Sequence, residues 1–140
     1  MEKDRFPLEE EAPDKQNLKG SETILVVENE RGIRSMISLS LKMHGYNVLQ
    51  AEDAESALRI FTERKNDIQL VLTDVIMPGL SGVEMIQKLK KIDGRTKVLY
   101  MSGYTKGKIE SGNSLPEDTH FIQKPFTAQD IIQKIRKTLD

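Results

Sequence analysis

The chain has 140 residues, with 21 lysines and arginines, 22 acidic residues, two histidines, and no cysteine or tryptophan. This length predicts one domain of ordinary size, and a net charge of −1 excludes a nucleic-acid binder that relies on overall positive charge. Without cysteine there is no disulfide, cysteine-based zinc site or thiol nucleophile, and without a long apolar stretch we expect a soluble, cytoplasmic protein that makes no direct membrane contact.

Residues 1–22 differ from the rest of the chain in charge and in pattern. Acidic residues outnumber basic ones there, Pro7, Pro13 and Gly20 interrupt the segment, and its apolar residues follow no period. Such a segment buries too little apolar surface to offset the entropy lost on ordering. We therefore predict a flexible acidic linker over residues 1–22 and one folded domain over residues 23–140.

Within the folded part, short apolar runs alternate with helical patterns. Residues 24–27 form a continuous apolar run, which predicts a strand buried on both faces. Apolar residues at helical spacing then predict a helix that ends near Gly45, and residues 46–49 predict the second strand. Asp53 is a favourable N-cap for a second helix.

The same alternation continues along the chain. Residues 68–73 predict the third strand. Ser81 and Glu84 have the spacing of a capping box, which predicts that a third helix begins between them. Residues 97–101 and 119–122 predict the fourth and fifth strands.

The segment between the last two strands has the weakest pattern. Two glycines and a proline interrupt residues 105–116, so we expect no more than two helical turns and a mobile segment there. After the fifth strand, Thr127 and Asp130 again have capping-box spacing, which predicts a last helix.

Five strands that alternate with helical segments predict an α/β fold, a doubly wound parallel sheet covered by helices on both faces. We expect the compact strand order 2-1-3-4-5. In such sheets, functional groups collect beyond the carboxyl ends of the strands, near the point where the strand order reverses.

Polar side chains follow four of the five predicted strands. Glu28 and Asn29 follow the first strand, Asp74 the third, Ser102 the fourth and Lys124 the fifth. In the expected strand order these four strand ends are neighbours, so the side chains should converge. Neighbouring carboxylates and other oxygen ligands suit Mg²⁺, while an ammonium group and a hydroxyl suit a phosphoryl group. Asp74 lies between them and can act as a nucleophile that forms an aspartyl-phosphate.

Each of these residues also has an ordinary structural explanation. An Asp after a strand is a common turn former, and an acid such as Glu28 is favoured at the start of a helix. Ser102 suits a turn, and Lys124 suits a solvated surface. Only their joint placement at four strand ends favours a common site.

Four segments resemble the signature motifs of bacterial response-regulator receiver domains, in order and at suitable spacing. They are residues 24–30 (ILVVENE), 72–82 (LTDVIMPGLSG), 100–104 (YMSGY) and 121–126 (FIQKPF). The resemblance covers residues 23–139 and implies a flavodoxin-like (βα)₅ fold.

This resemblance implies a role for each candidate residue. Asp74 is the phosphoacceptor, Lys124 pairs with the phosphoryl group, Ser102 is the switch hydroxyl and Phe121 is the aromatic switch position. The implied Mg²⁺ ligands are Glu28, Asn29, Asp74 and the Ile76 backbone carbonyl. The implied activity is self-phosphorylation with slow self-dephosphorylation, and the implied partner is a histidine kinase or a histidine phosphotransfer protein, with no nucleic acid.

The N-terminal segment has a resemblance of its own. Residues 7–11 (PLEEE), followed by a short spacer, resemble the junction between the ATP-binding domain of a histidine kinase and an attached receiver. This implies a fragment of a hybrid sensor kinase.

One position departs from the family pattern. The family usually places two acids after the first strand, and the second, a direct Mg²⁺ ligand, is Asn29 here. Asparagine coordinates through its carbonyl but brings no charge, so we expect weaker Mg²⁺ binding and slower phosphorylation unless Glu28 or Glu30 compensates. The alternative is a degenerate receiver that binds a partner without being phosphorylated.

Two other functions occur on related folds. A flavin-binding electron carrier needs a loop rich in Gly, Ser and Thr after the first strand, whereas Glu28 and Glu30 would repel the flavin phosphate. A phosphohydrolase with an aspartate nucleophile carries an Asp-x-Asp pair after the first strand. Here the corresponding positions hold glutamates, and the candidate nucleophile follows the third strand.

Overall fold

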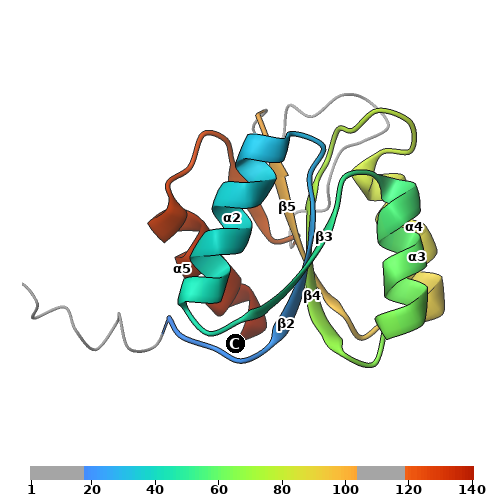
Figure 1. Cartoon of the computed structure of the whole chain (residues 1–140). Helices are drawn as coiled ribbons and strands as arrows, with labels where there is room; N and C mark the ends of the chain where they lie inside the picture. Colours follow the sequence, from blue (N-terminus) through green and yellow to red (C-terminus); the bar gives the residue numbers. More distant parts are fainter. Residues whose placement is uncertain (1–17, 104–118) are drawn as a thin grey trace, which may run out of the picture.

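The computed structural model describes residues 18–103 and 119–140 (Figure 1). Its elements are β2 (Thr23–Val27), α2 (Arg31–Met43), β3 (Asn47–Ala51), α3 (Ala54–Arg64), β4 (Ile68–Asp74), α4 (Gly82–Ile92), β5 (Lys97–Ser102), β6 (Phe121–Gln123) and α5 (Ala128–Leu139). The strands form one five-stranded sheet in the order β3-β2-β4-β5-β6, and all neighbouring strands are parallel. The predicted α/β fold and the strand order 2-1-3-4-5 are confirmed.

The sheet lies between two layers of helices. Helices α2 and α5 cover one face, and α3 and α4 cover the other (Figure 1). Side chains alternate along β2, so Ile24 and Val26 pack in the cluster beneath α2 and α5, while Leu25 and Val27 pack in the cluster beneath α3 and α4. Burial on both faces explains why the central strands are continuous apolar runs.

The helix starts agree with the sequence. The Asp53 side chain accepts a hydrogen bond from the Ser56 N–H at 2.8 Å. Complete capping boxes begin α4 at Ser81 and α5 at Thr127. These local motifs were readable because each needs only residues three positions apart.

Three predicted strands differ from the structure by one residue at one end, and the other two differ at both ends. The fifth strand was predicted over residues 119–122, but β6 begins at Phe121, because its pairing with β5 starts at Tyr100. The second strand was predicted over residues 46–49 and is found at Asn47–Ala51. The helical turns expected within residues 105–116 lie outside the described residues.

The end of the predicted linker contacts the domain. Leu18 is buried, and its carbonyl accepts a hydrogen bond from the Tyr46 hydroxyl at 3.2 Å. Arg136 binds the Glu22 carboxylate with two nitrogens, at 2.7 and 3.2 Å. These partners are 28 and 114 residues away along the chain, so no local pattern shows the contact.

Among the described residues, no helix has the length and apolar character needed to cross a membrane.

Candidate functional site

The carboxyl edge of the sheet brings together three charged residues from three strand ends. The Nζ atom of Lys124 lies 2.7 Å from Oδ2 of Asp74 and 2.9 Å from Oε1 of Glu28. All three side chains are buried or partly buried. The convergence that the strand order required is therefore present, with one ammonium group between two carboxylates.

Strand register fixes where these side chains lie. Asp74 is opposite Met101 in the pairing of β4 with β5, so Ser102 lies one residue further along. The Lys124 N–H donates to the Ser102 carbonyl at 2.7 Å, which anchors the lysine beside the end of β5. Ser102 itself is buried.

Glu28 is held in place from several directions. Its side chain is fully buried, Oε1 faces Lys124, and Oε2 accepts the Glu30 backbone N–H at 2.9 Å. Its carbonyl accepts a hydrogen bond from Nη1 of Arg34 at 2.7 Å. The sequence did not indicate that Arg34 helps to position Glu28, because its place in the helical pattern is that of an ordinary surface residue of α2.

Charge and burial shift the protonation of the site. Burial, together with the neighbouring Glu28 carboxylate, raises the pKa of Asp74 to about 6, although Lys124 acts in the opposite direction. Burial disfavours the charge on Lys124, but hydrogen bonds to Asp74 and Glu28 outweigh it and raise the pKa of the lysine. The lysine therefore remains a cation, and any further positive charge at the site favours ionised Asp74.

The backbone of Asp74 is held by two neighbours. The Thr73 hydroxyl donates to the Asp74 carbonyl at 3.0 Å. Gly82, the first residue of α4, lies so close that a Cβ atom there would collide with the same carbonyl, and its N–H donates to Val75 at 2.8 Å. In the sequence, Gly82 is simply the residue after the predicted cap Ser81, and only the fold shows that glycine is required for this approach.

The remaining candidate residues lie around this centre. Asn29 is exposed beyond the end of β2, and the Ile76 side chain is 41% exposed on the loop after β4. Phe121 is partly buried and packs against the core cluster beneath α3 and α4.

The oxygen donors at this edge suit a hard cation, but the acidic part of the set is small. Within residues 18–103 and 119–140, no group of three or more His, Asp and Glu side chains is arranged to hold a metal ion. The two buried carboxylates share the charge of one lysine, which leaves a net negative charge that a divalent cation would balance. The donor set therefore fits Mg²⁺, with less acidic charge than a site that carries a third carboxylate.

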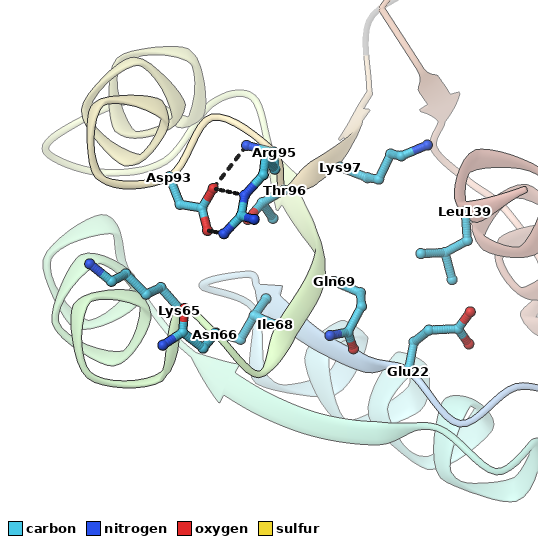
Figure 2. A pocket seen from close by; sticks show the side chains of 10 residues that line it. All are labelled: Glu22, Lys65, Asn66, Ile68, Gln69, Asp93, Arg95, Thr96, Lys97 and Leu139. Atoms are coloured by element: carbon cyan, nitrogen blue, oxygen red, sulfur yellow. Dashed lines mark hydrogen bonds and ion pairs between the residues drawn. The ribbon is translucent and has the colours of Figure 1, made fainter.

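The opposite edge of the sheet also carries a groove of about 410 Å³. Figure 2 shows its lining side chains, among them Lys65, Gln69 and Lys97, with Asp93 paired to Arg95. None of the candidate site residues lines it, so it is a separate feature.

Residues 24–136 match the family described as the response regulator receiver domain. The chain belongs to this family. The receiver is 34% identical over 120 residues to sporulation initiation phosphotransferase F of Bacillus subtilis. This alignment covers 85% of this chain and 94% of that protein. The resemblance seen in the four sequence motifs is thus confirmed.

Other similar proteins are larger. The receiver is 34% identical over 121 residues to the phosphate regulon transcriptional regulatory protein PhoB of Pseudomonas aeruginosa, covering 84% of the chain but only 51% of that protein. It is 30% identical over 126 residues to the sensor kinase CckA of Brucella abortus, covering 89% of the chain and 13% of that protein. The crystal structure of the receiver domain of hybrid histidine kinase CckA superposes with a TM-score of 0.72 at 33% identity, covering 84% of this chain and 99% of that one.

Proposed function

We propose that this receiver accepts a phosphoryl group on Asp74 in a two-component phosphorelay. The observation that carries the proposal is the position of Asp74, buried at the carboxyl edge of the sheet with the Lys124 ammonium 2.7 Å from its carboxylate. A buried carboxylate beside a fixed cation is a nucleophile in an environment that balances the charge of an incoming phosphoryl group.

The reaction transfers a phosphoryl group from the donor to the Asp74 carboxylate. An Asp74 oxygen forms a bond to phosphorus while the bond from phosphorus to the donor breaks, and the departing imidazole or carboxylate keeps the electron pair. Lys124 balances charge on the phosphoryl oxygens, and Ser102 presents its hydroxyl from the neighbouring strand. Bound Mg²⁺ would neutralise further phosphoryl charge, and Asn29, Asp74 and the Ile76 carbonyl, with Glu28 beside them, would hold it.

The phosphodonor we infer is a histidine kinase or a histidine phosphotransfer protein, and the donor group is a phosphohistidine. The similarity to the receiver of a hybrid histidine kinase supports a place in such a kinase, and the motif at residues 7–11 agrees with it. On this proposal the domain acts in the cytoplasm, without contact to nucleic acid or membrane.

A second candidate function follows from Asn29. With only Glu28 and Asp74 as acids at the site, and no larger acidic cluster in the described part of the chain, a receiver that binds its partner without being phosphorylated is the competing proposal. Intact Asp74 and Lys124, in direct contact, favour the phosphoacceptor.

The test is intact-protein mass spectrometry after incubation with acetyl phosphate and Mg²⁺. We expect one added phosphoryl group in the unaltered protein and none in Asp74→Asn. Asp67→Asn is the matched control, because Asp67 is an exposed acid just before β4, at the opposite end of that strand from Asp74, and it should be modified like the unaltered protein. Modification of Asp74→Asn would refute the assignment, and no modification of any form would favour the partner-binding receiver.

A further inference from the structure

We propose that the ring of Tyr100 holds Phe121 in its resting position and thereby preserves the full movement of the aromatic switch. This inference rests on the proposed function, because it concerns the conformational change that Asp74 phosphorylation would drive. It assigns a positioning role to a residue outside the phosphoacceptor site.

Strand pairing places Tyr100 beside Phe121. The two residues are direct partners in the pairing of β5 with β6, and Thr73 is the partner of Tyr100 on its other side. Paired residues in neighbouring strands point to the same face of a sheet. Both aromatic residues pack against the core cluster beneath α3 and α4, which agrees with this direction.

Because β6 is the last strand of the sheet, the residue paired with Phe121 on the neighbouring strand is Tyr100. Strand β6 has three residues and is the last strand of the sheet, so Phe121 has a paired strand on one side only. On that side its partner is Tyr100, whose side chain is 7% exposed, whereas Phe121 is partly buried. A fixed ring therefore lies next to a less confined one.

Tyr100 also lies beside two parts of the proposed switch: Ser102 on its own strand and, through Thr73 on β4, Asp74. Ser102 lies two residues after Tyr100 on β5 and so faces the same side of the sheet. On the other side, the Thr73 hydroxyl holds the Asp74 carbonyl. A movement of Ser102 toward a phosphoryl group on Asp74 would thus take place directly beside the Tyr100 ring.

The size of the ring, and not its hydroxyl, is the property we assign to Tyr100. Burial raises the pKa of its hydroxyl to about 12, and within residues 18–103 and 119–140 no hydrogen bond from this hydroxyl is found. A smaller side chain at position 100 should leave space that the Phe121 ring enters before any phosphorylation. The further movement on phosphorylation would then be smaller.

The test uses the full chain labelled with fluorophenylalanine and followed by ¹⁹F NMR, with and without beryllofluoride and Mg²⁺. Loss of one resonance in Phe121→Leu identifies the Phe121 signal. We expect this signal to move on addition of beryllofluoride in the unaltered protein and in Tyr100→Phe, the control that keeps the ring. In Tyr100→Leu we expect it to start displaced toward the beryllofluoride position and to move by less than half as much.

Tyr100→Leu keeps an apolar side chain in the core, and circular dichroism verifies that it folds. Equal movement of the Phe121 signal in Tyr100→Leu and in the unaltered protein would overturn the inference. So would a Tyr100→Phe protein that behaves like Tyr100→Leu, because the hydroxyl would then be the active group. If beryllofluoride changes no spectrum at all and acetyl phosphate adds no mass, the proposed function itself fails, which is a different outcome.

Discussion

The Lys124 ammonium and the Asp74 carboxylate, 50 residues apart in the sequence, lie 2.7 Å apart at the carboxyl edge of the sheet. The same ammonium reaches Glu28, so one cation serves two buried acids. The arrangement stabilises the folded chain only while the lysine is present, because each carboxylate would otherwise be buried beside a like charge.

We expect Lys124→Met to lower the free energy of unfolding by about 2 kcal/mol at pH 7, since it leaves two buried acids without their shared cation. Urea denaturation measures this change. Lys88→Met, at an exposed position of α4, is the control and should change stability little. An unchanged unfolding midpoint in Lys124→Met would show that the ion pairs contribute nothing to stability.

Asn29→Asp should tighten Mg²⁺ binding by about tenfold, because it places a further unit charge beside the ion. The structure adds a reason to expect that Glu28 does not replace the missing acid: both of its carboxylate oxygens already have partners, Lys124 and the Glu30 N–H. Titration calorimetry with Mg²⁺ on the two proteins gives the comparison. Equal affinities would mean that Glu28 or Glu30 already supplies the charge.

The sequence predicted the central site because every step needed only local information. Each strand is an apolar run, each candidate follows a strand end, and the strand order of a doubly wound sheet makes those ends neighbours. The structure accordingly brings three of the candidates together at the carboxyl edge of the sheet, Lys124, Asp74 and Glu28.

The features that the sequence did not show depend on contacts between distant segments. The requirement for glycine at position 82 comes from the Asp74 carbonyl that approaches it, and neither residue alone indicates the contact. In the same way, the sequence assigns Glu22 to an acidic linker, and only the structure shows that Arg136 of α5 binds it. The start of β6 was misplaced because a three-residue edge strand carries too few residues to show a pattern.

Ser38→Ala should raise the free energy of unfolding by about 1 kcal/mol. On the buried face of α2, the Ser38 hydroxyl has no hydrogen-bond partner among residues 18–103 and 119–140, and alanine is the better helix former. Ser35→Ala, at an exposed position of the same helix, is the matched control, because it gains helix propensity alone. Urea denaturation should show a larger gain for Ser38→Ala, and an equal gain would mean that the buried hydroxyl costs nothing.

The contact of Arg136 with Glu22 joins the first described residues to the last helix. Two guanidinium nitrogens meet the two carboxylate oxygens, and the Tyr46 hydroxyl and the Lys19 carbonyl accept further hydrogen bonds from Arg136. The hydrogen bonds from Arg136 lower the pKa of Glu22 below its usual value. A carboxyl whose pKa is lowered by folding contributes stability at neutral pH, and this contribution is lost as the pH falls through the lowered pKa.

Glu22→Gln should therefore lower the free energy of unfolding by about 1 kcal/mol at pH 7, because both side chains are partly buried and their hydrogen bonds are charged. The difference between the two proteins should shrink below about pH 4, where Glu22 becomes protonated in the unfolded chain and then in the folded one. Urea denaturation at several pH values between 3 and 7 measures it, with the exposed Glu63→Gln as control. A difference that stays constant across this range would show that packing of the side chain, and not its charge, holds this contact.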